Sequence, residues 1–254
     1  MRLATFVVTA VLPSLGWSGG GRPVDPGVVV NGGVRGSNPT RVLGESVPPP
    51  VVVTPPAKTP TTTVMPTSDI SMAATSWIIG PIIDGQNYSH NMPLQPAQDG
   101  AGWSFDFPAM DGLHYVTTPY GGGALTASKI RMTVTIAADP SVQFRATQGD
   151  TSARVRLYFQ RSGDDWRTES YRWWSNEFIE LRPGTYTLEV PMTPDHWFDV
   201  HGHQASEPAV TGGFNAAKGS VMSVGMTFGG MFAGHGVYTA GGHARFRLQE
   251  FAVR

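Results

Sequence analysis

Two segments near the middle of the chain, KIRMTVTIA (residues 129–137) and ARVRLYFQ (residues 153–160), alternate apolar and polar side chains. The apolar positions share one parity within each segment: Ile130, Met132, Val134, Ile136, Val155, Leu157 and Phe159. Arg154, Arg156 and Tyr158 take the opposite parity in the second segment. Because successive side chains of a strand point to opposite faces, this period of two predicts half-buried strands of an antiparallel sheet.

Similar runs lie on both sides of these segments, and turns rich in glycine, proline or aspartate separate them, such as SGDD (162–165) and RPGT (182–185). The runs are residues 102–107, 113–118, 171–175, 177–181, 185–190, 221–228 and 244–253. A short helix is expected only at residues 214–218. Short strands without alternating helices predict an all-β fold, an antiparallel β-sandwich of jelly-roll type.

The C-terminal stretch GMTFGGMFAGHGVYTAGGHARFRLQEFAV (residues 225–253) predicts a closing hairpin of this sandwich. Two inward rows are expected: Met222, Val224, Met226 and Phe228, then Ala244, Phe246 and Leu248. After Leu248 the next apolar residue is Phe251, so the step lengthens to three and predicts a β-bulge at Gln249 or Glu250.

Composition divides the chain into three parts. Ten of the 21 prolines fall within residues 22–69, and this segment contains no aromatic residue. It is therefore expected to be a disordered Pro/Thr/Val-rich linker. Six of the seven tryptophans follow from Trp77 onward, so the sandwich is expected over residues 70–254. Residues 1–21 contain one basic residue, then an apolar run and then small residues, which is the order of a secretory signal peptide. The alternative is an apolar N-terminal tail.

The absence of cysteine excludes disulfides, thiolate catalysis and zinc sites with cysteine ligands, and the net charge of −1 argues against a nucleic-acid ligand. Nucleic-acid binding is not expected, because phosphates call for a basic face. The central arginines are interspersed with Asp164, Asp165 and Glu169, which predicts a solvated face of mixed charge. The N-terminal apolar run is too short for a stable membrane span. Together these features favour a secreted or cell-envelope protein of bacterial type, with the Pro/Thr segment as a semi-rigid spacer.

A sandwich that follows a Pro/Thr spacer, and that closes on GGHARFRLQEFAV (residues 241–253), resembles the galactose-binding-like jelly rolls of many carbohydrate-binding modules. The resemblance covers about residues 75–254 and rests on the alternating aromatic and aliphatic residues of the last strand. It implies a non-catalytic module that binds a polysaccharide or another glycan surface. The acidic residues that often hold a structural calcium in such modules have no assigned counterpart in this sequence.

Motifs for phosphate binding and for carboxylate catalysis do not fit. GHGVYT (residues 234–239) has Thr239 where a dinucleotide-binding loop needs its third glycine, and no helix is expected after it. Glu177 and Glu180 lie three positions apart on one strand and so face opposite sides, unlike the paired carboxyl groups of glycoside hydrolases.

A candidate metal site lies in PDHWFDVHGH (residues 194–203). Asp199, His201 and His203 would share one face of a strand, a spacing that suits zinc or another divalent metal such as calcium. The alternative is a polar loop whose histidines are exposed or bonded to backbone. His235, between Gly234 and Gly236, could join this cluster if the last hairpin folds beside it.

Aromatic residues supply the candidate ligand site. The segment DDWRTESYRWWSNEF (residues 164–178) concentrates them, and the adjacent residues Trp173 and Trp174 must point to opposite faces of a strand. An exposed tryptophan can stack on a sugar ring while nearby polar groups orient it. The expected ligand-binding residues are Trp166, Tyr171, Arg172, Trp174, Trp197 and His235.

The leading functional hypothesis is therefore an exported, non-catalytic module that binds carbohydrate or another extracellular polymer. One alternative is a surface, adhesion or virion-type sandwich that assembles with copies of itself. Another is a polysaccharide lyase or hydrolase in which histidine with tyrosine or arginine does the proton transfer.

Overall fold

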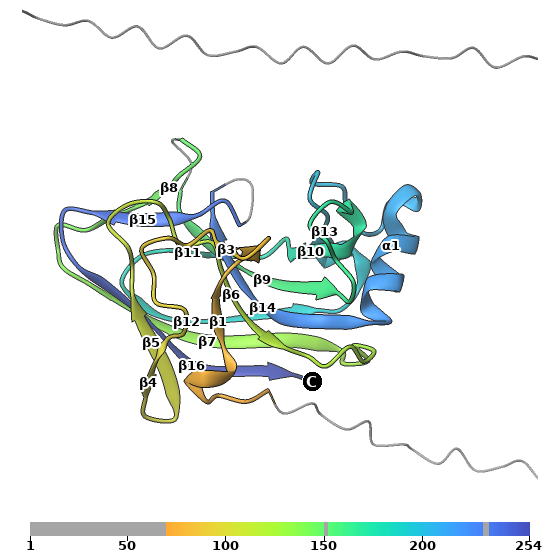
Figure 1. The fold of residues 1–254 in the computed structure, drawn as a ribbon, viewed down its shortest axis with the longest axis horizontal. Coiled ribbons are helices and arrows are strands. Elements are labelled where there is room, and N and C mark those ends of the chain that lie inside the picture. The colour runs from red at the N-terminus through yellow and green to blue at the C-terminus, as the bar shows by residue number, and fades with distance from the viewer. Residues whose placement is uncertain (1–69, 150–151, 231–233) are drawn as a thin grey trace, which may run out of the picture. The chain divides into compact units, whose positions relative to one another are not determined.

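A computed structural model describes residues 70–149, 152–230 and 234–254. The predicted signal peptide and the predicted disordered linker lie outside the described residues. The described chain confirms the all-β prediction: antiparallel strands form two large sheets, and one short helix, α1 (Pro208–Lys218), lies at one end of them (Figure 1). Among the described residues, no helix is long and apolar enough to cross a membrane.

The larger sheet follows the order β1, β6, β14, β9, β10, β13, and β11 also pairs with β9. These strands are β1 (Ile78–Gly80), β6 (Tyr115–Pro119), β9 (Arg154–Arg161), β10 (Arg172–Ser175), β11 (Ile179–Glu180), β13 (Trp197–Phe198) and β14 (Val221–Gly229). All of its neighbouring strands are antiparallel.

The second large sheet follows the order β12, β7, β16, β5, β4. Its strands are β4 (Ala97–Asp99), β5 (Gly102–Asp106), β7 (Lys129–Ala138), β12 (Gly184–Pro191) and β16 (Ala244–Val253). Two small two-stranded sheets complete the strands: β2 (Ile82–Ile83) with β3 (Gln86–Asn87), and β8 (Gln143–Ala146) with β15 (Val237–Ala240). Three 3₁₀ turns are η1 (Ala74–Ser76), η2 (Glu169–Tyr171) and η3 (Pro194–His196).

The core consists of the apolar rows of both large sheets, as the period of two predicts. Strand β7 alternates between buried and half-buried positions along most of its length, and its buried side chains belong to one cluster with those of β9, β14 and β16. Phe105 and Phe246 stack with ring centroids 5.1 Å apart, and Phe228 of the larger sheet meets Phe246 edge-on at 5.5 Å. These contacts join the two sheets through a continuous aromatic layer.

Several local predictions can be compared with the strands. The register of β16 against β7 shifts between Leu248 and Glu250, which confirms the predicted bulge. The helix α1 extends beyond the expected residues 214–218 and starts at Pro208, where a proline is tolerated because the first helical N–H has no partner within the helix. The inward row of β14 is confirmed except for Met222, which is 39% exposed. A register shift between Val221 and Ser223 turns Met222 to the outer face and puts Val221 into the core.

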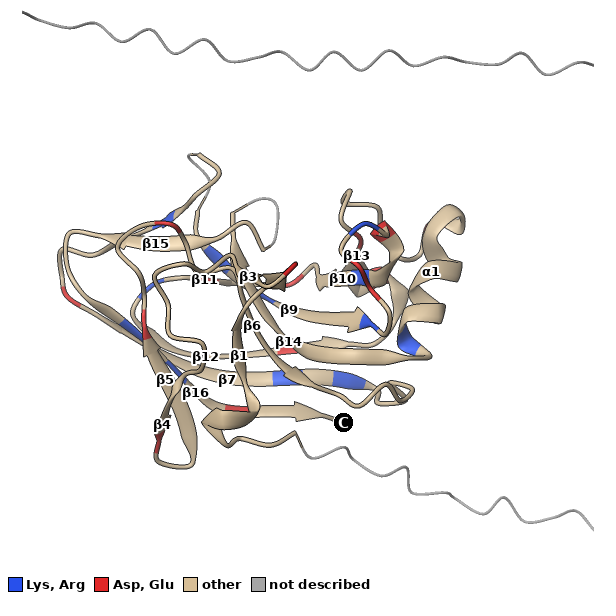
Figure 2. Cartoon of the chain, viewed as in Figure 1, with Lys and Arg blue, Asp and Glu red and all other residues tan. Residues whose placement is uncertain are grey.

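The predicted solvated face of mixed charge is wrong at two of its arginines. Arg156 and Arg172 are 7% and 8% exposed, although both lie on the outer side of the larger sheet. Their guanidinium groups bond to nearby backbone carbonyls and pack over aromatic rings, as described below. Elsewhere the charged residues are scattered along the strands and loops and do not gather in one region (Figure 2).

Candidate functional site

The outer face of the larger sheet carries a row of directly opposed residues that crosses five of its strands. From β6 to β13 the row is Thr117, Gly225, Tyr158, Trp174 and Phe198. A Cβ atom on Gly225 would lie 2.3 Å from the carbonyl oxygen of Val116, so only glycine fits at this close approach. The row therefore has an aromatic half on β9, β10 and β13 and an open half on β14 and β6.

A second aromatic cluster, separate from the main core, forms on this face around Tyr115, Tyr158 and Trp174. The rings of Tyr115 and Tyr158 meet edge-on at 5.1 Å, and those of Trp174 and Phe198 stack at 6.1 Å. Trp166 packs edge-on against Tyr115 at 5.6 Å. The outer face thus has an aromatic floor of its own, which the sandwich core does not require.

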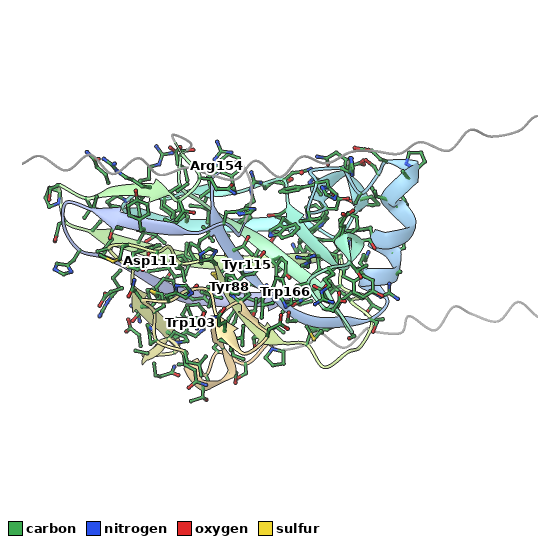
Figure 3. All side chains as sticks on the ribbon, turned by 45° about the horizontal axis from the view of Figure 1, so that its top comes forward. Tyr88, Trp103, Asp111, Tyr115, Arg154 and Trp166 are labelled. Atoms are coloured by element: carbon green, nitrogen blue, oxygen red, sulfur yellow. The ribbon has the colours of Figure 1, made fainter. Side chains whose placement is uncertain are left out.

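Two adjoining hollows open above this floor, and they share Pro81, Tyr115 and Trp166 as a common wall. Together we call them the outer groove. The first hollow has a volume of about 260 Å³ and lies toward β1, β6 and the start of β14. The second has a volume of about 270 Å³ and lies toward β10, β13 and the loop at residues 234–235. Figure 3 shows Tyr88, Tyr115 and Trp166 close together at this wall, and Tyr88 lines the second hollow.

Trp166 is held in the wall by a network of buried polar groups. Its φ of 66° lies in the left-handed region, which bulky residues rarely adopt and which tends to persist only where neighbouring structure imposes it. The Asp164 carboxylate accepts a hydrogen bond from the Trp166 backbone N–H at 2.9 Å and another from the Gln160 amide at 2.8 Å. Arg172 donates to the Trp166 carbonyl at 2.9 Å, and its guanidinium lies 5.2 Å from the indole centroid.

The charges around the groove are largely compensated. Arg172 Nε lies 3.2 Å from Asp164 Oδ2, and the Asp164 side chain has no exposed surface. Asp199 Oδ1 accepts hydrogen bonds from the backbone N–H groups of His201 and His203, both at 2.9 Å. A desolvated ion pair needs such additional bonds to be tolerated. The groove consequently offers a ligand aromatic surface and hydrogen bonds more than net charge.

Burial favours the neutral forms of two histidines and two tyrosines of the groove. Burial lowers the pKa of His114, although its Nδ1 lies 2.9 Å from the carbonyl oxygen of Gly234. Burial and then the nearby His114 lower the pKa of His235. Burial raises the pKa of both the Tyr115 and the Tyr158 hydroxyl, so each keeps its proton at neutral pH. The Tyr158 hydroxyl makes no hydrogen bond within the described part of the chain.

Several residues singled out in the sequence meet at this groove. Trp166, Arg172, Trp174, Asp199 and His235 all line the second hollow, although they come from three separate segments of the sequence. Trp173 and Trp174 point to opposite faces, as predicted: Trp173 belongs to the main core and Trp174 to the outer cluster.

Two of the expected ligand-binding residues lie elsewhere. Trp197 has no exposed surface, packs edge-on against Phe159 at 5.0 Å and donates its indole N–H to the Pro191 carbonyl, so it is a core residue and we remove it from the candidate site. Tyr171 lies outside both hollows, and the Arg161 guanidinium covers its ring at 4.4 Å. The sequence does not distinguish Trp197 and Tyr171 from the aromatic residues of the groove, because each lies beside polar segments that resemble loops.

The Asp/His cluster does not converge on a metal. His201 Nε2 pairs with Glu169 at 2.7 Å, whereas His203 Nδ1 turns to Asp199 at 3.3 Å and the other Asp199 oxygen accepts the loop amides. Within the described ranges, no three His, Cys, Asp or Glu side chains are arranged to hold a metal ion. The expected calcium or zinc site at Asp199, His201 and His203 is therefore corrected to a hydrogen-bonded polar loop.

The groove also contains residues that sequence reasoning missed. Tyr115 lies in the predicted strand at 113–118, and its parity with Thr117 was the available signal that it faces outward. Pro81, Ile82 and Tyr88 come from a segment that had no predicted strand. Only the folding of β1 onto β6 brings that segment over the sheet.

Comparison with known proteins adds no relative: no family model matches the chain, and no curated protein matches it.

Proposed function

We propose that the protein binds a glycan in the outer groove. The observation that carries the proposal is Trp166, a half-buried indole held at a positive φ by Asp164 and Arg172 in the wall between two hollows. The main hydrophobic core does not include this ring. A strained aromatic residue outside the core, fixed by buried polar bonds, is typical of a preorganised ligand site.

The chemistry of the groove suits a sugar ring. Trp166, Tyr88, Trp174 and Phe198 present aromatic surface on which the apolar face of a pyranose can stack. The rings of His114 and His235 also line this hollow and can orient a sugar. A largely apolar pocket with a few orienting polar groups is the usual form of a small-molecule site.

The sequence of the N-terminal part supports an exported protein. A basic residue followed by an apolar run and small residues is typical of a signal peptide, and the Pro/Thr segment suits a spacer that holds a binding module away from its anchor. We infer that the glycan lies outside the cytoplasm, on a cell envelope or in an extracellular matrix.

Screening the full chain on a glycan array, followed by titration of the retained glycans, tests the proposal. Trp166→Ala should weaken binding by about tenfold or more, because aromatic anchors carry much of the free energy of binding at a recognition site. Tyr186→Ala is a matched control, since Tyr186 is a half-buried aromatic residue of β12 in the other sheet. Retention of no glycan, or equal binding by Trp166→Ala and wild type, contradicts the proposal.

A second candidate function, turnover of a polysaccharide, is favoured by the two histidines. His114 and His235 line the same hollow, and burial lowers the pKa of both, which favours the neutral imidazole that a proton acceptor requires. Incubating the retained glycans with the protein and measuring new reducing ends and new unsaturated products tests it. Product formation that His235→Ala abolishes would make the groove an active site, whereas no product with a tightly bound glycan supports a binding module.

A further inference from the structure

The two hollows of the outer groove differ in chemistry. Five apolar aliphatic or proline side chains surround the first hollow, above Tyr115, Tyr158 and Trp166: Ile78, Pro81, Ile82, Pro119 and Met222. No Asp, Glu, Lys, Arg or His among the described residues lines it. The second hollow contains Arg172 and Asp199 together with His114 and His235. One half of the groove is therefore apolar and uncharged, and the other is aromatic and polar.

Two of the polar side chains that line the first hollow, Ser223 and Gln160, are already bonded. Ser223 donates to the Gln160 side-chain oxygen at 3.1 Å, and the Gln160 amide donates to Asp164 at 2.8 Å. A sugar ring placed there would exchange its hydrogen bonds with water for few new ones, which is unfavourable. An uncharged apolar group placed there would lose no hydrogen bonds and would cover exposed hydrocarbon.

The rim of the first hollow is unusually exposed for its residue types. Ile78, Ile82 and Met222 are 37%, 44% and 39% exposed, and they gather around one opening. Met222 faces this opening only because the bulge between Val221 and Ser223 breaks the alternation of β14. Isolated apolar residues on a surface are ordinary, whereas an apolar cluster around a hollow indicates a binding surface.

The two hollows adjoin at Pro81, Tyr115 and Trp166, so a ligand that passes over this shared wall can reach both. Resting on the proposed function, we propose that the ligand is an amphiphilic glycan: a sugar in the second hollow carrying a short, uncharged apolar substituent, an alkyl, acyl or aryl group, that enters the first. Trp166 lies between the two and contacts both parts. The volume of about 260 Å³ suits a substituent of a few carbon atoms more than a long lipid chain.

Titration with methyl, hexyl and phenyl glycosides of glucose, galactose and mannose tests this inference. For the sugar that binds, the hexyl glycoside should bind about tenfold tighter than the methyl glycoside, because each buried methylene contributes to affinity. The phenyl glycoside distinguishes a preference for an aryl group from one for an alkyl chain. Equal affinities of the methyl, hexyl and phenyl glycosides overturn the inference while leaving glycan binding intact.

A matched pair of variants locates the effect. Met222→Ser should remove most of the gain from the hexyl group and weaken the methyl glycoside much less than the hexyl glycoside. Met110→Ser replaces a methionine that is 61% exposed and outside both hollows, and it should leave both affinities at their wild-type values. If Met222→Ser weakens the methyl and hexyl glycosides equally, the first hollow is not the apolar subsite. If no glycoside binds but hexanol does, the sugar assignment of the second hollow fails and the proposed function fails with it.

Discussion

The two faces of the larger sheet use the same strands for different purposes. Trp173 and Trp174 are neighbours on β10, and both are almost fully buried. Trp173 points inward, into the main core. Its ring meets Phe214 of α1 edge-on at 5.1 Å, and its indole N–H donates to the Ser170 carbonyl. Trp174 faces outward, stacks with Phe198 and lines the second hollow. Burial alone therefore does not separate a core aromatic residue from a groove residue.

The two faces of the larger sheet differ in the structure that packs over them. The inner face is closed by the second sheet and by α1, and Trp173 has no exposed surface. In the described part of the chain, short segments cover the outer face: Pro81 and Ile82 after β1, the turn around Trp166, and the loops at residues 199–202 and 234–235. Incomplete cover over an aromatic floor produces a groove, and the following predictions test this distinction.

The largest effect is expected from Trp173→Ala on the inner face. Removing a fully buried indole leaves a cavity in the core, so the free energy of unfolding should fall by about 3–5 kcal/mol. Chemical denaturation followed by circular dichroism measures this loss. Trp173→Phe, which keeps a ring against Phe214, should lose clearly less, and equal losses for the two variants would contradict the packing role.

A smaller loss of stability is expected from Gly225→Ala in the middle of the outer row. The added Cβ would lie 2.3 Å from the Val116 carbonyl oxygen and 2.7 Å from Thr117 Cα, so β14 and β6 must separate. We expect the free energy of unfolding to fall by about 1–3 kcal/mol, the usual cost of overpacking. Gly123→Ala has open space around its Cβ and serves as the control. Unchanged stability of Gly225→Ala would show that the outer row has room for a side chain.

The positive φ at Trp166 predicts a difference of about 1 kcal/mol in the free energy of unfolding between two variants that both remove the indole. Trp166→Gly should be more stable than Trp166→Ala by about this amount, because the left-handed conformation penalises any residue with a Cβ. Thermal or chemical denaturation of the two variants measures the difference. Alanine at least as stable as glycine would indicate that the backbone is not held at a positive φ.

The smallest effect concerns the loop that closes the second hollow. The hydrogen bond to Glu169 raises the pKa of His201, so their attraction is complete while the imidazole is protonated and is lost as the pH rises through this raised pKa. Amide hydrogen exchange of residues 199–203, corrected for the intrinsic rate, should therefore be slower at about pH 5 than at about pH 8. His201→Gln should remove this difference. His243→Gln, outside the groove, should leave it unchanged.

The sequence predicted most of the sandwich because its strands alternate in a way that only a half-buried sheet explains. The bulge after Leu248 and the opposite faces of Trp173 and Trp174 followed from counting parity. The prediction failed at Met222, where a bulge at the start of β14 reverses the parity. Nothing in VMSV (residues 221–224) marks this bulge, because Val221 and Met222 are both apolar and either one could face the core.

The candidate site was predicted in part, from residue type more than from position. Trp166 and Trp174 were singled out as members of one aromatic cluster, together with the nearby Arg172, and all three line the groove. Trp197 was singled out on the same grounds and belongs to the core. Asp199, His201 and His203 have the spacing of a metal site, but their side chains satisfy Glu169 and the loop backbone instead.

By itself, then, the amino-acid sequence determined the fold class, the positions of most strands and the two faces of each strand, because side-chain parity is a local property of extended backbone. The tertiary structure alone decided which face is closed by the second sheet and which remains an open groove. That choice depends on contacts between segments far apart in the chain, such as the pairing of β1 with β6 and the edge-on contact of Trp166 with Tyr115. Local patterns carry no record of such contacts.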